Sequence, residues 1–452
     1  YNINLEPNEE KEITFVCSLE ENIEEIDGLN TINKELLRMT GLIYDTGILQ
    51  NSKMNDKKLD MIKTLILATD NFVVNRPSFG LHTIIAGYPW FLDWGRDSLI
   101  SFEGLLLLTK RYDIAKEVLL TNIRDMKFGL VPNGYSGYDN RPLYNSADSS
   151  LLLIEQVYKY LKYTNDNEFV REKMYSSLIK IIDAYSDRIE VDGDNIYLDK
   201  EDNLLSAGTE NTQITWMDVK IDNKAITPRN GKTVELNALW YNALKIMARL
   251  AEKYEDKQLC KKYLKMANAT KESFDKKFYN KDKKCLFDVL GDEKIRPNQL
   301  FALSLSHPIV DSIEIAENVL NVVESKLLND YGLKTLSSDD NEYVDVYEGA
   351  PYKRDSSYHQ GITWPWLLGL YYDAIKNIIK IEKDNGKREM LEKKLLKLVE
   401  KTKNTFKTEM FERSSIGTIS EIYDSKEPYE ERGAFAQAWS VAEIFRIVSN
   451  RS

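Results

Sequence analysis

Apolar residues recur at the three- and four-residue spacing of amphipathic helices along most of the chain. The spacing predicts twelve helices, over residues 55–75, 96–109, 113–126, 147–163, 167–188, 233–253, 257–278, 297–306, 311–326, 360–381, 387–409 and 434–448. No strict repeat of about 34 or 40 residues is present, which argues against a helical-repeat solenoid. We therefore expect an all-α fold over nearly the whole chain.

The connections between these helices alternate in character. Those before every second helix are mostly long and rich in Gly, Pro and aromatic residues, and they cover residues 76–95, 127–146, 189–232, 279–296, 327–359 and 410–433. Several of the others are short, such as 110–112, 164–166 and 254–256. The alternation predicts six helical hairpins in a ring, an (α/α)6 barrel, with a cleft where the long loops gather. A loose α-superhelix, the alternative, would not require distinctive residues before every second helix.

The N-terminal residues have a different pattern. Residues 2–6 and Glu12–Ser18 alternate like β-strands on either side of a Glu6-Pro7-Asn8 turn, and a polar connection follows to about residue 54. We interpret the strands as the short remnant of a β-rich domain. The predicted division is residues 1–30 as the end of that domain with a linker, and residues 31–452 as the helical catalytic domain.

Charge and cysteine content narrow the class of partner. The formal net charge is −11 over 452 residues, which disfavours nucleic acid and anionic membrane surfaces, and no apolar run is long enough to span a bilayer. Cys17, Cys260 and Cys285 are too few and too widely spaced for a disulfide framework or a metal cluster, so we expect a cytoplasmic protein without metal or cofactor. A neutral ligand such as a sugar is consistent with this acidic net charge.

The third long loop carries an aromatic residue and a carboxylate two positions apart, Trp216 and Asp218. An aromatic side chain can cover a sugar face while an adjacent carboxyl, with its pKa raised by desolvation, protonates an oxygen. We predict that Asp218 is the general acid of a glycoside hydrolase, although Lys220 nearby would lower its pKa. Glu235, which enters the next helix, is a second candidate acid or a residue for packing or hydroxyl binding.

The first two long loops contribute candidate sugar contacts. Trp94 can stack on a sugar ring, and Arg96 with Asp97 offers donors and acceptors for neighbouring hydroxyls. The structural alternative is that Asp97 caps the following helix and Arg96 pairs with an acid. Asp148, at the start of another helix, is either a substrate contact or a carboxylate favoured by the helix dipole.

The fourth and fifth loops add polar and aromatic residues. A predicted helix begins at Arg296-Pro297-Asn298-Gln299, so the side chain of Gln299 either reaches the cleft or caps that helix. Tyr358, His359 and Gln360 can hydrogen-bond hydroxyls, and Trp364 can form a wall. A lone histidine is more often structural, but its polar and aromatic neighbours favour ligand contact.

The sixth loop supplies the second carboxylate, Glu421. It lies in a different loop from Asp218, and two loops at one barrel mouth can hold carboxyls about 6.5–9.5 Å apart, as inverting glycosidases require. Asp424 is the local competitor for this role, and Asp345, Glu348 and Asp355 are further carboxylates near the fifth loop.

Together these loops resemble the amylo-α-1,6-glucosidase domain of glycogen debranching enzymes, most closely the archaeal and bacterial branch. The resemblance covers about residues 80–448. It rests on six motifs in order, namely Trp94-Gly95-Arg96-Asp97, Thr215-Trp216-Met217-Asp218, Val234 to Tyr241, Arg296-Pro297-Asn298-Gln299, Tyr358-His359-Gln360-Gly361 with Trp364-Pro365-Trp366, and Ser420-Glu421-Ile422 with Gln437-Ala438-Trp439-Ser440.

The resemblance implies an inverting hydrolase on an (α/α)6 barrel that acts on the α-1,6 branch points of glycogen or limit dextrin. It places the acid on Asp218, the base on Glu421, and a non-reducing-end glucose contact on Arg96 and Asp97, and it includes Trp439 among the cleft residues. It also identifies the N-terminal strands as the end of the β-sandwich found in prokaryotic members. No glucanotransferase domain is present in this chain, so we expect another enzyme to trim the substrate first.

Two other kinds of function stay open. A glucoamylase, a trehalase-like hydrolase or a disaccharide phosphorylase can use the same barrel, and a phosphorylase would not need Glu421 as a base. A non-catalytic glucan-binding module is the third hypothesis, and the presence of both Asp218 and Glu421 argues against it.

Overall fold

A computed structural model of the chain describes residues 2–18, 26–48, 56–136, 140–191, 194–413 and 416–449. Tyr1, residues 19–25 of the predicted N-terminal part, the first residue of the predicted helix 55–75 and short pieces of three predicted loops lie outside the described residues. The described part is mostly helical, with its strands in seven small sheets. The prediction of a largely helical fold is confirmed.

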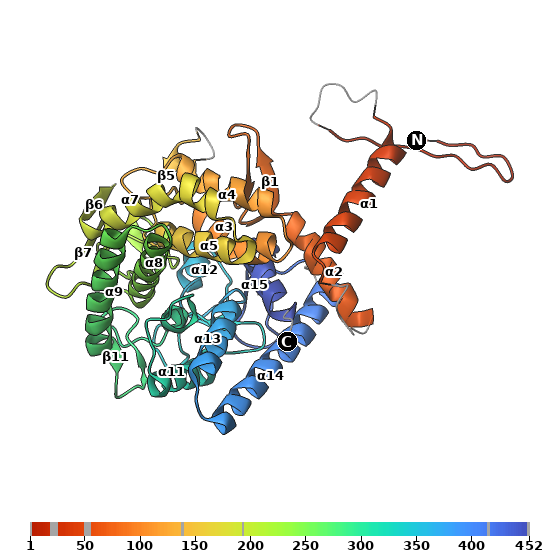
Figure 1. The fold of residues 1–452 in the computed structure, drawn as a ribbon. Helices are drawn as coiled ribbons and strands as arrows, with labels where there is room; N and C mark the ends of the chain where they lie inside the picture. Colours follow the sequence, from red (N-terminus) through yellow and green to blue (C-terminus); the bar gives the residue numbers. More distant parts are fainter. Residues whose placement is uncertain are drawn as a thin grey trace.

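Six helices are linked by a closed cycle of contacts (Figure 1). Each contacts the next along the chain, and α15 contacts α3. They are strongly buried, and α15 buries every residue except Arg446. The six are α3 (Gly95–Phe102), α5 (Ser149–Thr164), α8 (Val234–Lys253), α10 (Phe301–Ser304), α13 (Leu367–Ile381) and α15 (Ala438–Val448).

Six further helices each contact at least one member of this cycle, and they bury a single face. In α9 the buried residues are Tyr263, Ala267, Thr270 and Phe274, which lie on one stripe at the helical period. These outer helices are α2 (Asp56–Asp70), α4 (Tyr112–Arg124), α7 (Tyr175–Ser186), α9 (Lys257–Lys277), α11 (Ile313–Lys326) and α14 (Asn385–Glu412). Each of the twelve predicted helices therefore has a counterpart.

Short non-α turns extend several of these helices. The π-helical turn η1 (Glu103–Leu107) continues α3, and the 3-10 turn η3 (Pro297–Leu300) leads into α10. The short α6 (Asn167–Phe169) and the π-helical turn η2 (Val170–Met174) precede α7. The predicted ranges 96–109, 167–188 and 297–306 thus include these turns.

Two of the predicted inner helices begin later than expected. The range 360–381 gives a helix only from Leu367, because Trp364 precedes a proline, which disfavours helical backbone for that residue, and pairs in a strand instead. The range 434–448 gives a helix only from Ala438, because Ala436 and Gln437 pair with another strand. In both cases the residues before the helix are held at its N-terminal end.

Small sheets tie the long loops together. β3 (Gly87–Tyr88) pairs with β17 (Ala436–Gln437), which joins the first and last long loops, with Tyr88 opposite Ala436. A four-stranded antiparallel sheet joins the fifth and sixth loops through β13 (Leu333–Lys334), β14 (Thr363–Trp364), β15 (Ile422–Tyr423) and β16 (Glu431–Arg432). The remaining strands are β1 (Val73–Arg76), β2 (Leu81–Ile84), β4 (Gly134–Tyr135), β5 (Pro142–Leu143), β6 (Arg188–Val191), β7 (Asp194–Leu198), β8 (Leu205–Ala207), β9 (Lys220–Ile221), β10 (Lys224–Ala225), β11 (Tyr279–Asn280) and β12 (Cys285–Leu286).

The N-terminal part differs from the prediction. Residues 2–18 contain no strand in the structure; they form an extended arm with a turn in which the Glu9 N–H donates to the Glu6 carbonyl at 2.9 Å. An isolated pair of strands without a packed face is marginal in water, which explains the absence of a ladder. Instead of a polar connection, residues Gly28–Asp45 form α1, which Asp27 caps by accepting from the Asn30 N–H. Figure 1 shows α1 and the arm projecting from the helical body.

A second unpredicted helix, α12 (Pro351–Ser357), lies within the fifth loop. Its proline occupies the first turn, where the fixed φ of proline favours helix initiation.

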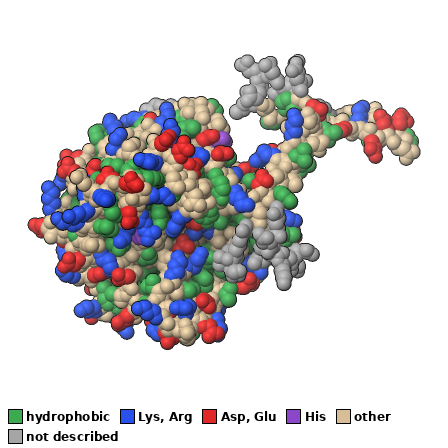
Figure 2. Space-filling view, in the orientation of Figure 1, with side chains coloured by type: hydrophobic (Ala, Val, Ile, Leu, Met, Phe, Trp, Pro, Cys, Tyr) green, Lys and Arg blue, Asp and Glu red, His purple; other side chains and the backbone are tan. Residues whose placement is uncertain are grey.

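On the face seen in Figure 2, acidic and basic side chains are interspersed over the helical body. Among the described helices, none combines the length and apolar character needed to cross a membrane. The described residues also contain no group of three or more His, Cys, Asp or Glu placed to hold a metal ion.

Candidate active site

A pocket of about 260 Å³ lies where the long loops meet the N-terminal ends of the inner helices. We call it the inner pocket, and its size is close to the lower end of the ~300–1,000 Å³ range of small-molecule sites. Nine of the predicted site residues line it together with three others. The lining residues are Phe91, Trp94, Arg96, Asp97, Asn133, Asn145, Trp216, Asp218, Tyr358, His359, Trp364 and Trp439.

The first turn of α3 places Arg96 in this pocket. A side chain at Gly95 would collide with the backbone carbonyl of Pro132, so glycine allows the helix to start close to the neighbouring loop. The Arg96 Nε donates to both carboxylate oxygens of Asp148 at 2.9 Å, and its Nη1 donates to Asp218 Oδ2 at 2.8 Å. Arg96 therefore joins the second loop to the predicted acid in the third loop.

Asp218 combines burial with access to the pocket. Its carboxyl accepts from Arg96, and its side chain remains 37% exposed. Burial raises the pKa of Asp218 above its ordinary value, although the positive charge of Arg96 opposes that rise. A carboxyl in this state holds its proton more readily than a surface aspartate does and still faces the open pocket.

Glu421 is almost completely buried, at 1% exposure. The Tyr358 hydroxyl donates to its Oε1, and the Ala434 N–H donates to its Oε2 at 2.8 Å. No cation pairs with Glu421 among the described residues. Burial raises its pKa to about 7, against the two hydrogen bonds, and the charge of Asp218 adds to the rise.

Gly433 makes room for Glu421. Its φ is +69°, a conformation that favours glycine, and a side chain here would collide with Glu421 Oε2. Because Gly433 precedes the Ala434 N–H that donates to Glu421, this turn both shapes and supports the carboxyl.

Asp97 adds a third carboxyl to this region. It lies one residue after Arg96, is 9% exposed, and accepts from Gln437 Nε2 at 3.4 Å. Burial raises its pKa well above the ordinary value; Arg96 opposes the rise, and Asp218 and Glu421 add to it. The three carboxyls therefore lie within electrostatic range of one another, beside a single arginine, which favours retention of protons in the site.

Aromatic residues form the wall and floor of the pocket. The Trp216 ring is edge-on to Trp364 and Trp366, with centroids 5.5 and 5.1 Å apart, and Trp439 stacks on Trp366 at 5.3 Å. The Trp216 Nε1–H donates to Asn298 Oδ1 at 2.6 Å, which fixes the ring. At 3% exposure Trp216 is part of a packed aromatic cluster and also faces the pocket beside Asp218.

Several buried polar atoms of the lining are unpaired. In the described part of the chain, Arg96 Nη2, both ring nitrogens of His359 and Trp439 Nε1 have no hydrogen-bond partner. Unpaired buried donors cost free energy, about 1–3 kcal/mol each. Burial and the charges of Arg296, Arg96 and Arg229 lower the pKa of His359, so its neutral ring offers one donor and one acceptor. This lining suits a ligand that carries several hydroxyl groups.

Four predicted substrate contacts lie outside the lining and are engaged with protein groups. Asp148 holds Arg96, and Glu235 accepts from Arg229 Nη2 at 2.6 Å. Gln299 Nε2 donates to the Arg296 carbonyl at 3.0 Å, and Gln360 Oε1 accepts from Arg296 Nη2 at 2.7 Å. In the structure these four residues lie outside the pocket lining and bind other protein groups, and they help to hold the lining residues in place.

Glu235 belongs to a continuous buried network. Arg229 Nε also donates to Asp288 Oδ2 at 2.5 Å, and Asn298 Nδ2 donates to Asp288 Oδ1 at 2.8 Å. Since Asn298 also accepts from Trp216, the network extends from Glu235 to the pocket wall. The commitment of both Glu235 oxygens to Arg229 makes it a poor proton donor to a ligand.

Asp424, the competitor to Glu421, has a structural partner. Its Oδ2 accepts from Arg432 Nη2 at 2.8 Å, and its Oδ1 accepts from the Tyr347 N–H at 2.8 Å. Asp355 accepts from the Tyr347 hydroxyl at 3.2 Å. Both carboxylates therefore hold the fifth loop in place, whereas Glu421 has no cationic partner in the described residues.

Sequence reasoning did not select three of the lining residues: Phe91, Asn133 and Asn145. Asn133 follows Pro132 and precedes a glycine, a turn signal that marks a fixed loop. Its Oδ1 accepts from the Arg96 N–H at 3.3 Å, and its Nδ2 donates to Asn145 Oδ1 at 3.3 Å. The sequence therefore indicates the turn, but it does not indicate the contact between Asn133 and Arg96.

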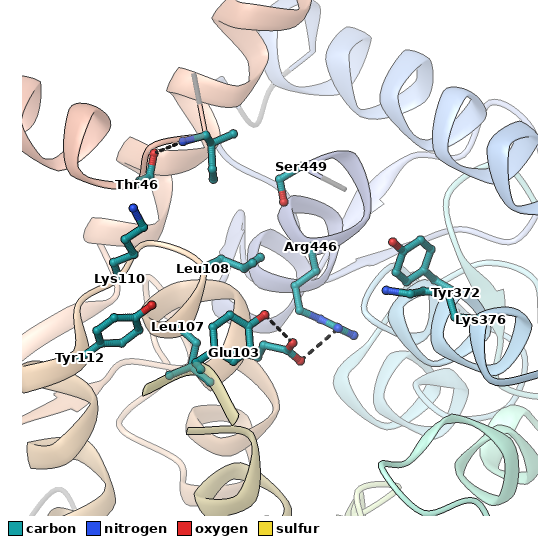
Figure 3. A pocket seen from close by; sticks show the side chains of 12 residues that line it. Thr46, Glu103, Leu107, Leu108, Lys110, Tyr112, Tyr372, Lys376, Arg446 and Ser449 are labelled. Carbon is teal, nitrogen blue, oxygen red and sulfur yellow. Dashed lines mark hydrogen bonds and ion pairs between the residues drawn. The ribbon is translucent and has the colours of Figure 1, made fainter. Parts of the chain in front are cut away.

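A larger cavity, of about 380 Å³, lies at the C-terminal ends of α3 and α15 (Figure 3). The Glu103 carboxylate in its lining is compensated by cations: it accepts from the Tyr163 hydroxyl at 3.0 Å and from Lys159 at 2.7 Å, and it pairs with Arg446 at 3.1 Å. These cations lower the pKa of Glu103 despite its burial. The pairing of Glu103 with two cations contrasts with Glu421, which has no cationic partner among the described residues.

A helical framework that presents an aromatic-walled pocket, neutral hydrogen-bonding groups and three neighbouring carboxyls of raised pKa has features in common with glycoside hydrolase sites. Comparison with known proteins agrees with this class. A family model described as amylo-alpha-1,6-glucosidase matches residues 67–446. The chain belongs to the amylo-α-1,6-glucosidase family, which confirms the resemblance drawn from its motifs.

The chain is also similar to a protein of Saccharomyces cerevisiae (strain ATCC 204508 / S288c) named glycogen debranching enzyme. The two are 24% identical over an alignment of 391 residues, which covers 66% of this chain and 25% of the relative. The chain thus matches about a quarter of the relative's length.

Proposed function

We propose that this protein is an inverting glycoside hydrolase that releases glucose from α-1,6 branch points of glycogen or a limit dextrin. Family membership and the name of the yeast relative support a glucan substrate. The observation that carries the proposal is a pair of carboxyls of raised pKa from different loops. Asp218 lines the aromatic-walled pocket, and Glu421 lies outside the lining but accepts from the lining residue Tyr358 and is within electrostatic range of Asp218.

The proposed scaffold is an (α/α)6 barrel. The closed cycle of contacts among six buried helices, with an outer helix beside them in each predicted hairpin, supports it. The site residues come from the loops before these inner helices or from their first turns, which is the arrangement expected for a cleft at one end of such a barrel.

In the proposed reaction, Asp218 gives its proton to the glycosidic oxygen as the bond to the anomeric carbon breaks. Glu421, as a carboxylate, removes a proton from a water molecule that attacks the opposite face of the sugar. The Tyr358 hydroxyl and the Ala434 N–H hold Glu421 in a fixed orientation. The products are β-glucose and the debranched chain.

The inner pocket accommodates the glucose that is released. Trp94 and Trp439 provide ring faces, and Arg96 Nη2 and His359 supply hydrogen bonds to hydroxyls. The neutral His359 adds no charge that would compete with the two carboxyls. A pocket of this size holds one sugar ring, which fits release of a single glucose.

The direct test replaces Asp218 with Asn and measures glucose released from a branched α-glucan. Loss of a proton donor should lower kcat by about 100-fold or more. With α-D-glucosyl fluoride, whose leaving group needs little protonation, the loss should be much smaller. The matched control is Asp222→Asn, four residues away at an exposed turn with positive φ, where asparagine fits and full activity is expected.

Full activity of Asp218→Asn on the branched glucan would refute its role as the acid. The stereochemistry is tested separately, by following the first-formed anomer of glucose by NMR. Inversion of an α-linkage requires β-glucose first, so initial release of α-glucose would refute the role of Glu421 as a base.

A further inference from the structure

A second cavity opens next to the inner pocket and has a volume of about 630 Å³. We call it the outer cleft. The two cavities share no lining residue. The outer cleft is lined by Trp90, Tyr347, Glu348, Gly349, Arg354, Asp355, Arg432 and Gly433.

The two cavities adjoin through neighbouring aromatic residues. Trp90 of the outer cleft and Phe91 of the inner pocket have ring centroids 6.3 Å apart. On the other side, Tyr347 of the outer cleft and Tyr358 of the inner pocket have centroids 5.5 Å apart. Two pairs of neighbouring aromatic residues therefore separate the cavities, and each pair has one member in the inner pocket and one in the outer cleft.

The catalytic carboxyls lie at this boundary. Tyr358 donates to Glu421, and Gly433 of the outer cleft is packed against the same carboxyl. The charges of both Glu421 and Asp218 raise the pKa of Tyr358, which places Tyr358 near both groups. A bond that is cleaved between these carboxyls has one side in the inner pocket and the other side toward the outer cleft.

The outer cleft has the chemistry of a sugar-binding surface. Trp90 is 59% exposed, although burial of a tryptophan is normally favourable, so its large apolar ring is available to a ligand. Phe435 is 54% exposed and follows Ala434 beside β17, whose pairing with β3 brings it close to the Trp90 loop. Apolar ring faces are suited to the C–H face of a glucose unit.

The polar groups of the cleft are arranged around this surface. Arg354 Nε donates to Asp355 at 3.0 Å, and the Tyr347 hydroxyl donates to the same carboxylate at 3.2 Å. The Arg354 side chain is 42% exposed and that of Arg432 31%, so both have donors that water or a ligand can reach. Their carboxylate partners reduce the net charge, which suits a neutral ligand with many hydroxyls.

We infer that the outer cleft binds the glucan chain that leaves when glucose is released, with Trp90 as its stacking platform. The inference rests on the proposed function, because it assigns the other half of the same substrate. It makes Trp90 a specificity residue for the leaving chain, distinct from the residues that hold the released glucose.

The test uses two substrates that deliver the same glucose with different leaving groups. α-D-Glucosyl fluoride has a leaving group of one atom, which cannot reach the outer cleft, whereas a maltooligosaccharide with an α-1,6-linked glucose fills it. Trp90→Ala should lower kcat/KM on the branched oligosaccharide about tenfold or more, as loss of an aromatic contact predicts. Its kcat/KM on the fluoride should stay within about twofold of the wild type.

Two variants serve as controls. Trp90→Phe keeps a ring face and should restore most of the activity on the branched oligosaccharide. Tyr44→Ala removes an aromatic side chain of similar exposure, 67%, from α1, which projects from the helical body, and should change neither substrate.

Direct binding supplies a second readout. A linear maltotetraose, which represents the leaving chain, should bind the wild type in a calorimetric titration, and Trp90→Ala should raise its Kd about tenfold. Equal loss on both substrates, no loss on either, or unchanged maltotetraose binding would overturn the inference. If the wild type hydrolyses neither substrate, the proposed function itself fails, and weakened maltotetraose binding in Trp90→Ala would still identify the cleft as a glucan site.

Discussion

Glu421→Gln should make the protein more stable at alkaline pH while abolishing its activity. Glu421 is 1% exposed and lacks a cationic partner among the described residues, so its negative charge is held at a cost. The substitution keeps the shape of the side chain and removes the charge. It therefore separates what the carboxylate contributes to the reaction from what it costs the fold.

The magnitude follows from the pKa of Glu421. Burial raises that pKa from 4.5 to about 7, and at about 1.36 kcal/mol per pKa unit this corresponds to roughly 3 kcal/mol. A carboxyl whose folded pKa is raised binds its proton more tightly in the folded state. Its contribution to the free energy of unfolding is therefore fully present below pH 4.5 and is lost as the pH rises through about 7.

The assay is urea unfolding, followed by tryptophan fluorescence, at pH 5 and pH 8 for the wild type and Glu421→Gln. Between these two pH values the wild type should lose about 2–3 kcal/mol more stability than the variant does. Buried carboxyls that do not interact with Glu421 contribute equally to both proteins and cancel in this difference. Any constant effect of placing an amide next to the Tyr358 hydroxyl and the Ala434 N–H cancels as well.

Two further variants decide the interpretation. Glu201→Gln removes an exposed carboxyl and should leave the pH dependence as in the wild type. Glu409 is also fully buried, and burial raises its pKa, so Glu409→Gln should reduce the pH dependence while glucose release continues. If Glu421→Gln keeps the full pH dependence of the wild type, Glu421 is not held as a destabilised charge, and the reasoning is refuted.

Three other results are expected. Arg229→Ala removes the cation that pairs with the buried Glu235 and should lower the free energy of unfolding by about 3–5 kcal/mol, measured as a reduced urea midpoint; an unchanged midpoint would contradict the role of this network. Gly433 has a φ of +69°, and Gly433→Ala would place a side chain against Glu421, so it should lower kcat by at least about tenfold. A wild-type kcat in this variant would contradict the role of Gly433. Because activity requires one proton shared between Asp218 and Glu421, kcat/KM should fall above a pH of about 7, and a profile that is flat to pH 9 would exclude this pair.

The helices were predictable because their signal is local. The stripe of Tyr263, Ala267, Thr270 and Phe274 on α9 depends only on the spacing of residues along one segment. The exceptions also have a physical origin. The β3–β17 pairing delays the start of α15 through partners almost 350 positions apart, which no local pattern contains.

The sequence indicated which candidate residues gather at one pocket, but it did not indicate how they are connected to one another. Loop residues before the inner helices, such as Trp94 and Asp218, do line one pocket. Glu235 and Gln360 have the same type of position and the same chemistry, but their partners are arginines on other segments, at 229 and 296. Which polar residue faces a ligand and which holds a neighbour is decided by such long-range pairs.

The difference between paired and unpaired carboxyls gives a physical criterion for the site that is independent of sequence similarity. Glu235 and Asp288 share Arg229, Asp424 has Arg432, and Glu103 has Lys159 and Arg446. Around the inner pocket, Arg96 is the cation paired with Asp218 and also acts on Asp97, while Glu421 is within electrostatic range of Asp97 and Asp218. A fold selected for stability alone would remove or pair such charges, since each costs free energy. Their retention beside an open pocket is explained if the reaction needs one carboxyl that keeps its proton and another that takes one, and Glu421→Gln tests that explanation.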